Sequence, residues 1–422
     1  MKIRHLQVGL CLIPLLAAAD DWPTYRHDNR RSAVSPEGLH QPLQEDWVYR
    51  APRPPQTAWA GPARWDAFSG NEGLQSMRNF DPVFFVTVQG SQVFFGSSVD
   101  HAVHARDVRT GKENWVFFTG GPVRLPPTCA NGKVYFGSDD GYAYCVNADK
   151  GALIWKTQPL KETRMIPSNG ALISRRPCRT GVLVQGPHAY FGASLLPWQS
   201  SYLCAVDAET GSKQGPGCFT TQASEVTYQG ALLASSSTLY VPQGRSAPLR
   251  YDLHTGANRG SISGMGGVFC VLTTDDQILA GPQNQKSRDS LLRIGIGKKN
   301  DPGLVTFPRA DRVLLAGEQA YIHQRNELVA LHVESYRKCL AAKSDPSPSY
   351  RWRKKHPVPM GYILAGEHLV VGTDNHVTLY QAATGEVTWE AEVQGRAYGL
   401  AAANGRLFVS TDRGHIYCFG PR

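Results

Sequence analysis

Several catalytic signatures are missing from this chain of 422 residues. It has no G-x-S-x-G nucleophile elbow, no H-E-x-x-H zinc motif and no P-loop for nucleotide phosphates. Nine cysteines are present, but none forms a C-x-x-C pair and no two are adjacent. The sequence therefore gives no support to thioredoxin-like, zinc-dependent or nucleotide-dependent chemistry.

Long apolar runs are also scarce, and the one notable run lies at the start. Lys2 and Arg4 precede an apolar stretch over residues 6–16, and three alanines follow at 17–19. This order is typical of a secretory signal peptide, and the run is too short to span a bilayer as a helix. We predict a signal peptide over residues 1–19 and an exported protein, periplasmic or extracellular.

The remaining chain, residues 20–422, is predicted to form one domain. Cys11 does not indicate a lipoprotein, because it lies inside the apolar run and follows Leu10, where a lipobox needs a small residue. Eight cysteines remain after cleavage, and an oxidising compartment permits disulfides among them. Only 19% of the residues are charged, whereas 42 glycines and 28 prolines suit an all-β fold built from turns.

A repeated pattern of short strands and tight turns organises the chain. Residues 131–155 contain aromatic and β-branched runs separated by Asp/Gly turns, which is typical of an antiparallel meander. Related copies end near residues 107, 147, 207, 252, 295, 332, 381 and 420. Eight units at this period predict an eight-bladed β-propeller of four-stranded antiparallel blades. Hairpins scattered through a β-sandwich are the alternative.

The two ends of the chain are predicted to share the last blade. The C-terminal unit stops at residues 418–420 without an outer strand of its own, whereas Asp46–Arg50 resembles such a strand. We expect Asp46–Arg50 to pair with His415–Phe419. Pairing of the two termini in this way would close the ring and remove the exposed sheet edges.

The repeat resembles that of pyrroloquinoline-quinone (PQQ) propellers. The pattern A-x-D-x-x-T-G-x-x-x-W is complete at Ala105, Asp107, Thr110, Gly111 and Trp115. Gly151 with Trp155 and Gly385 with Trp389 match in part, and the opening W-P-x-Y-R-H-D is similar to the start of exported quinoprotein-like chains. The family includes non-catalytic relatives similar to the B subunit of the outer-membrane β-barrel assembly machinery.

This resemblance implies that each Trp docks against the neighbouring blade. Trp115, Trp155 and Trp389 with Gly111, Gly151 and Gly385 are therefore structural candidates. Gly215 and Gly260 stand where Trp is expected in the third and fourth units, so the docking residues of those units stay open.

Blade geometry predicts that the longer connections share one face of the propeller, called here the long-loop face. They are residues 51–81, 158–180, 193–200, 219–228, 242–248 and 282–290. They hold eleven basic and six acidic residues, a net charge of +5, with several aromatic side chains. Arg and Trp are enriched at binding hot spots. Candidate partner-binding residues are Trp59, Arg64, Trp65, Arg78, Arg164, Arg175, Arg176, Arg179, Trp198 and Arg245. The alternative is that the arginines are solvated and the aromatics pack under their own loops.

No catalytic, cofactor or metal residue is predicted. His101, His376 and His415 open strands in neighbouring blades, but each is expected to point into water rather than to bind a metal. The resemblance raises PQQ and calcium as cofactors, but calcium needs several oxygen ligands at once. Quinoprotein alcohol dehydrogenases of the family also place adjacent cysteines over the quinone, and this chain has none.

Three functions follow as hypotheses. The first is a non-enzymatic scaffold, predicted to be monomeric, that binds a protein partner or envelope component through the long-loop face. The second is a polysaccharide-binding module, and the third is a PQQ- and calcium-dependent dehydrogenase. Nucleic acid is a poor candidate because the chain is predicted to be exported.

Overall fold

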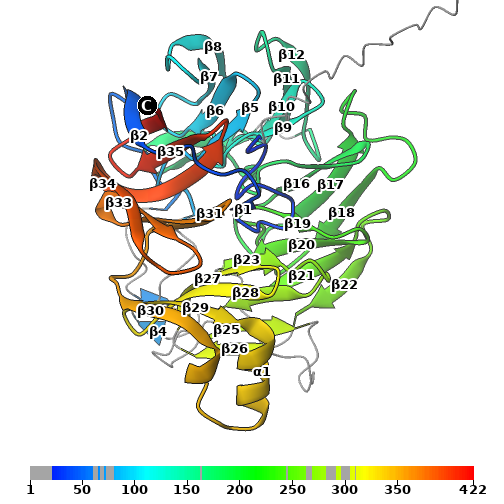
Figure 1. Cartoon of the computed structure of the whole chain (residues 1–422). Helices are drawn as coiled ribbons and strands as arrows, with labels where there is room; N and C mark the ends of the chain where they lie inside the picture. Colours follow the sequence, from blue (N-terminus) through cyan, green and yellow to red (C-terminus); the bar gives the residue numbers. More distant parts are fainter. Residues whose placement is uncertain are drawn as a thin grey trace, which may run out of the picture.

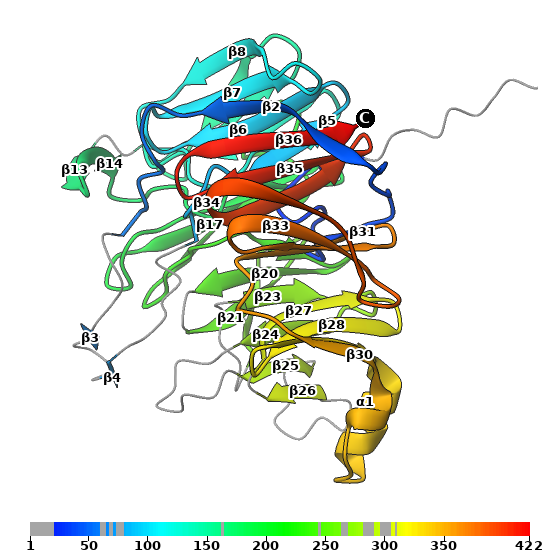
Figure 2. The ribbon, with the colours of Figure 1, turned by 60° about the vertical axis from the view of Figure 1, so that its left-hand side comes forward.

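The computed structural model describes residues 21–59, 65–66, 71–72, 80–161, 164–243, 246–262, 269–281, 291–295, 305–308 and 310–422. These residues form an all-β structure with one α-helix, α1 (Val333–Ala341), and one 3₁₀ turn, η2 (Ser347–Ser349). Figures 1 and 2 show the sheets following one another in sequence order, with α1 at the edge of the molecule. No helix in the described ranges combines the length and the apolar character needed to cross a membrane.

Six antiparallel sheets have four strands each, taken consecutively from the chain. The first contains β5 (Val86–Gln89), β6 (Gln92–Ser97), β7 (Ala102–Asp107) and β8 (Glu113–Phe118). The second contains β9 (Thr128–Ala130), β10 (Lys133–Gly137), β11 (Ala143–Asn147) and β12 (Leu153–Thr157). The third contains β15 (Leu183–Gln185), β16 (His188–Ala193), β17 (Ser201–Asp207) and β18 (Phe219–Ala223).

The next three sheets follow the same plan. The fourth contains β19 (Leu233–Ala234), β20 (Thr238–Gln243), β21 (Ser246–Asp252) and β22 (Asn258–Ser261). The fifth contains β23 (Phe269–Leu272), β24 (Ile278–Gly281), β25 (Leu291–Gly295) and β26 (Val305–Pro308). The sixth contains β27 (Ala310–Ala316), β28 (Gln319–Gln324), β29 (Glu327–His332) and β30 (Tyr350–Lys355).

A further sheet of eight strands joins the two ends of the chain, in the order β1-β31-β32-β33-β34-β35-β36-β2. Its members are β1 (Val34–Ser35), β31 (Gly361–Ala365), β32 (His368–Gly372), β33 (Asp374–Gln381), β34 (Val387–Ala403), β35 (Arg406–Thr411), β36 (His415–Pro421) and β2 (Leu43–Arg50). The first part of β34 pairs with β33 and its last part pairs with β35. β2 pairs antiparallel with β36, with Trp47 opposite Cys418 and Arg50 opposite His415. The architecture is that of a β-propeller.

Two short hairpins lie outside these sheets. β3 (Trp65–Asp66) pairs with β4 (Asn71–Glu72), and β13 (Met165–Ser168) pairs with β14 (Ala171–Ser174). Figure 2 shows β13 and β14 standing out from the stacked sheets.

The D-x-x-T-G pattern sets the turn between the last two strands of a sheet. The Asp107 carboxylate accepts hydrogen bonds from the backbone N–H groups of Arg109 and Thr110 and from the Thr110 hydroxyl. Gly111 follows with φ of +66°, a conformation that glycine adopts without steric cost. Asp207 makes the same three bonds in its own turn, and Asp252 makes the two backbone bonds, from His254 and Thr255. The repeated letters therefore encode one local turn.

Each repeat glycine also lies under an aromatic ring from the preceding sheet. A Cβ atom on Gly151 would come within 2.6 Å of the Trp115 ring, and one on Gly211 within 2.7 Å of Trp155. The indole N–H groups of Trp115 and Trp155 donate to the carbonyls of Ala148 and Ala208, at 2.8 and 3.0 Å. The packing between sheets thus requires glycine at these positions, because only a residue without a side chain allows the ring to lie flat on the turn.

The same contact recurs at junctions that the sequence pattern did not show. Trp47 lies over Gly111 and Trp352 over Gly385, and Phe219 takes the role of Trp over Gly256. Phe219 comes four residues after Gly215, which explains how the third unit docks without a Trp at the expected position. Trp389 instead donates to the Leu43 carbonyl at 2.9 Å, where the N-terminal strand begins.

Residues 21–40 cross the centre of the molecule and bind the first strand of sheet after sheet (Figure 1, dark blue). Main-chain hydrogen bonds connect Trp22 with Val88, Pro23 with Cys129, Asn29 with Ala234, Arg30 with Leu272, and Ala33 with Leu364. The buried Arg31 side chain donates to the carbonyls of Leu232, Tyr25 and Asp28. The W-P-x-Y-R-H-D opening is thus a central structural segment, which sequence reasoning did not foresee.

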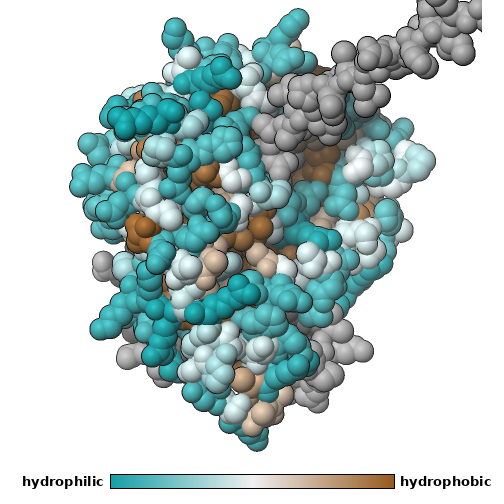
Figure 3. All heavy atoms as spheres, in the orientation of Figure 1, coloured by the Kyte–Doolittle hydropathy of each residue, from teal (hydrophilic) through white to brown (hydrophobic). Residues whose placement is uncertain are grey.

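The surface seen in the view of Figure 1 is mostly hydrophilic, with apolar residues in small separate clusters (Figure 3). All eight cysteines of the described residues are free thiols, and most are buried. The structure therefore makes no use of the disulfides that the cysteine count permits.

Candidate functional site

A buried cluster of two arginines and two aspartates lies under the long-loop face. Asp139 and Asp81 are 1% and 2% exposed, and Arg124 and Arg179 are 6% and 1% exposed. They come from four separate segments: the connections before β5, β9 and β15 and the turn between β10 and β11. The cluster therefore joins loops from the first three sheets.

Asp139 is the centre of the cluster. It accepts hydrogen bonds from Arg124 Nε at 2.6 Å and from Arg179 Nε and Nη2 at 2.9 and 2.8 Å. Arg124 Nη1 also donates to Asp81 Oδ2 at 2.7 Å, and the Ala58 N–H donates to the same oxygen. Two guanidinium groups balance two carboxylates, which is the condition under which charges can be buried.

The two carboxylates have opposite pKa directions. Burial alone would raise the pKa of Asp139, but Arg179 and Arg124 outweigh it and hold that pKa below its usual value. At Asp81 burial is the largest cause and raises the pKa to about 6, although Arg124 and, more weakly, Arg179 act to lower it. Its Oδ1 atom is buried without a hydrogen-bond partner in the described part of the chain.

This difference predicts a pH-dependent stability at Asp81. A raised pKa means that the folded state binds a proton more readily than the unfolded state. Protonation of Asp81 therefore stabilises the fold below about pH 4, and this stabilisation is lost as the pH rises through 6. The shift corresponds to about 3 kcal/mol. We expect the stability of Asp81→Asn, relative to the parent, to increase by about that amount between pH 4 and 7.5. Denaturant titrations at several pH values measure this, and parallel stability curves for the two proteins would contradict it.

Loops of the long-loop face are bound to one another around this cluster. Arg124 Nη1 also donates to the Gln56 carbonyl, and the Asn169 side chain donates to the Thr57 carbonyl. Arg176 Nε donates to the Ser200 carbonyl at 3.2 Å. Residues 51–59, 169–180 and 194–200, which are far apart in the sequence, therefore form one connected surface.

The structure divides the sequence-predicted binding residues into three groups. Arg179 is buried against Asp139 and its guanidinium lies 5.4 Å from the centre of the half-buried Trp59 ring. These two residues meet, but inside the protein. Arg179 therefore cannot contact a partner in this state, because its charge neutralises Asp139; its assignment as an exposed binding residue is corrected. Trp59 also donates to Gln229 Oε1 at 3.0 Å, so it is bonded to the segment before β19.

The second group is accessible. Trp198 is 77% exposed in the connection between β16 and β17, and Arg164 is exposed just before β13. Arg175 and Arg176 are half-buried, with the Arg176 guanidinium 5.4 Å from the centre of the Tyr202 ring. The third group, Arg64, Arg78, Arg245 and the Trp65 side chain, lies outside the described residues.

Apolar side chains extend the accessible surface, and sequence reasoning did not select them. Leu160 is 43% exposed, and Met165 and Leu172 on the β13–β14 hairpin are 38% and 60% exposed. The signal available in the sequence was an Asn-Gly turn at 169–170 between two short apolar runs, Met165–Pro167 and Ala171–Ile173.

The carboxylates of the cluster are poorly suited to calcium. Calcium takes six to eight oxygen ligands, whereas Asp139 is occupied by two guanidinium groups and Asp81 by one. Among the described residues, no group of three or more His, Cys, Asp or Glu side chains is placed to hold a metal. His101, His376 and His415 do not come together as such a group.

Comparison with known proteins assigns the family. A family model described as outer membrane protein assembly factor BamB matches residues 61–337 and 340–421. The chain belongs to this family of PQQ-type propellers. No curated protein matches the sequence.

Solved structures of other proteins share the fold of this BamB-family chain. A quinohemoprotein alcohol dehydrogenase from Pseudomonas putida HK5 superposes with a TM-score of 0.61 at 12% identity, covering 95% of this chain and 80% of that one. A europium-containing methanol dehydrogenase gives 0.55 at 12% identity, covering 92% and 89%. BamB from Moraxella catarrhalis gives 0.39 at 13% identity, covering 90% and 97%, a score too low to assign the fold. At these identities the structural likeness concerns the fold alone, and the family assignment comes from the sequence model.

Proposed function

We propose that this BamB-family chain is an exported, non-enzymatic propeller that binds a protein partner through the long-loop face. The observation that carries the proposal is a group of exposed apolar residues on connections of this face: Leu160, Met165, Leu172 and Trp198. Met165 and Leu172 are on the β13–β14 hairpin, and the connection that holds Trp198 is bonded to the segment after this hairpin through Arg176 and Ser200. Exposed apolar side chains gathered on one loop surface are typical of protein-binding sites. Export is supported by the signal-peptide pattern of residues 1–19 and by the family description.

The underlying cluster supports this proposal by making the surface rigid. The loops that carry the exposed residues are fixed by the hydrogen bonds of Asp139, Arg124 and Arg176 described above. A surface held in one conformation loses less conformational entropy when a partner binds. Arg164, Arg175 and Arg176 add positive charge around the apolar group, which favours a partner with an acidic surface.

We further propose that the propeller has eight blades and that the N-terminal strand closes the ring. Six four-stranded sheets and the two halves of the eight-stranded sheet account for the blades. The pairing of β2 with β36 supports closure, as does Trp47, which sits on β2 and donates to the Val108 carbonyl in the first sheet at 2.9 Å. The bond from Trp389 to Leu43 supports it from the other side.

A PQQ-dependent reaction is not supported by the buried carboxylates. General-base catalysis requires a carboxylate that can reach the substrate proton. Asp81 and Asp139 are instead buried and bonded to guanidinium groups. We therefore propose no oxidation chemistry for this chain.

The binding proposal is tested with the purified mature protein and solubilised native envelope. We expect a protein to co-purify with the parent and to be lost with Leu172→Ser combined with Trp198→Ser. The matched control is Phe118→Ser combined with Val387→Ser, which removes two apolar residues that are 68% and 50% exposed on other sheets. Mass spectrometry identifies the bound species. Recovery of a glycan alone, equal recovery by both double variants, or substrate-dependent dye reduction after addition of PQQ and calcium would contradict the proposal.

A further inference from the structure

The sixth sheet presents an unusually basic edge, formed by β30. Its sequence is Tyr-Arg-Trp-Arg-Lys-Lys, and exposure alternates along it so that Arg351, Arg353 and Lys355 are exposed on one face. The other face carries Trp352, which docks on Gly385 of the next unit. Docking therefore fixes the strand and directs the three cations outward.

Within the described residues, no ion pair within 4 Å and no side-chain hydrogen bond engages Arg351, Arg353 or Lys355. Two acids are nevertheless close: Glu327 lies opposite Lys355 on β29, and Asp345 interacts electrostatically with Arg353. By contrast, Arg337 and Lys338 on the nearby helix α1 are both paired with Glu334. Figure 3 shows strongly hydrophilic side chains over this side of the molecule. The four cations of β30 outnumber the two nearby acids and repel one another, so an anion bound there would relieve this repulsion.

Protection of a sheet edge does not explain this much charge. A single lysine or a proline is commonly enough to prevent edge-to-edge aggregation. The outer strands β2, β8 and β34 carry acidic residues, Glu45, Glu113 and Glu390 among them, and β12 carries one lysine. β30 differs from all of these because it has four cations and no acid.

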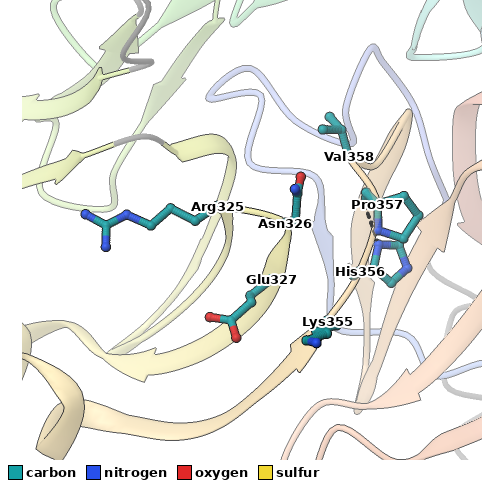
Figure 4. A pocket seen from close by; sticks show the side chains of 7 residues that line it. All are labelled: Arg325, Asn326, Glu327, Lys355, His356, Pro357 and Val358. Atoms are coloured by element: carbon teal, nitrogen blue, oxygen red, sulfur yellow. Dashed lines mark hydrogen bonds between the residues drawn. The ribbon is translucent and has the colours of Figure 1, made fainter.

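An open pocket continues the basic edge beyond Lys355. It has a volume of about 730 Å³ and is lined by Arg325, Asn326 and Glu327 on one side and by residues 355–358 on the other (Figure 4). The backbone N–H of His356 donates to the Asn326 carbonyl at 2.9 Å, which holds the two sides of the pocket together. Arg325 has φ of +50°, an unfavourable conformation for a side chain of its size. The turn thus exposes a cation at the rim of the pocket, and Figure 4 shows its side chain directed away from Lys355 and residues 356–358.

We propose that the edge of β30 binds an acidic, extended peptide segment of a protein partner as an added strand. In the described part of the chain, β30 pairs with β29 on one side and with no strand on the other. Cations at every second residue match the period of acidic side chains on an added strand, since alternate residues share one face. Opposite charges on neighbouring strands stabilise the pairing.

This surface is distinct from the long-loop site of the proposed function. Figure 2 shows β30 at the opposite end of the molecule from β13 and β14. A negative result for one surface therefore leaves the other unaffected.

The test uses fluorescence anisotropy of the mature protein with a labelled eight-residue peptide of alternating Glu and Thr. We expect saturable binding that weakens with added salt and falls about tenfold with Arg351→Gln combined with Arg353→Gln. The matched control is Arg109→Gln combined with Lys150→Gln, which removes the same charge from exposed turns of other sheets and is expected to leave binding unchanged. Circular dichroism confirms that both variants are folded.

Two further peptides distinguish strand addition from general attraction of anions. A block peptide, four Glu followed by four Thr, has the same charge without the alternation and is expected to bind more weakly. The backbone N–H groups of an added strand point alternately toward β30 and away from it. Methylation of the nitrogens that point toward β30 is expected to abolish binding, whereas methylation of the other set is expected largely to preserve it. Absence of binding by the alternating peptide, or equal affinity for the alternating, block and methylated peptides, would overturn the proposal. The second result would leave β30 as a surface for polyanions of any kind, such as an acidic polysaccharide.

Discussion

Trp155→Ala is expected to lower the free energy of unfolding by about 3–5 kcal/mol. The side chain is 6% exposed and packs on the Gly211 turn of the next sheet, while its N–H bonds to the Ala208 carbonyl. Alanine would leave a cavity between two sheets and would remove one of the two side-chain hydrogen bonds to the Ala208 carbonyl, which also accepts from the Tyr135 hydroxyl at 3.2 Å. Denaturant titration of the purified protein gives the value.

The control for this prediction is Trp198→Ala. Trp198 is 77% exposed, so its loss is expected to change stability by less than about 0.5 kcal/mol. If Trp155→Ala kept the parent stability but lost a binding activity, Trp155 would belong to a ligand site and the structural assignment would be wrong.

The same substitution at Trp47 tests ring closure. Trp47 is on the N-terminal strand and lies over Gly111 of the first sheet, as Trp155 lies over Gly211. If the ring is closed at this junction, Trp47→Ala should destabilise the protein about as much as Trp155→Ala. A change near zero at Trp47 with a large change at Trp155 would mean that the N-terminal junction is open.

Sequence reasoning reached the propeller because its repeat encodes a local structure. Asp107, Thr110 and Gly111 fix one turn through contacts within five residues, so their letters recur wherever the turn recurs. Docking was harder to see at Phe219, because any large planar ring can cover a glycine and the contact selects shape rather than one residue type.

The candidate site was less accessible to sequence reasoning, since its key contacts are between distant segments. Arg179 and Asp139 are 40 residues apart, and nothing near Arg179 in the sequence indicates a buried partner. A loop arginine read alone is expected to be solvated. Burial of the pair follows from the way two sheets bring their connections together, and this also explains why Trp59 faces inward.

Asp139→Asn is expected to destabilise the protein by about 3–5 kcal/mol, because it leaves two buried guanidinium groups with only Asp81 as a counter-charge. Denaturant titration near neutral pH measures the loss, and Asp149→Asn, an exposed turn acid, is the matched control.

A second variant separates the lost charge balance from the lost hydrogen bonds. Adding Arg179→Met to Asp139→Asn removes the unpaired charge and is expected to recover part of the stability, since a buried pair costs most when only one member is removed. Because Asp139 holds the loops that carry the accessible residues, the single variant should also bind the envelope partner more weakly at temperatures where it is still folded. Wild-type stability in Asp139→Asn, or a double variant less stable than the sum of the two single changes, would show that the cluster does not hold this face together.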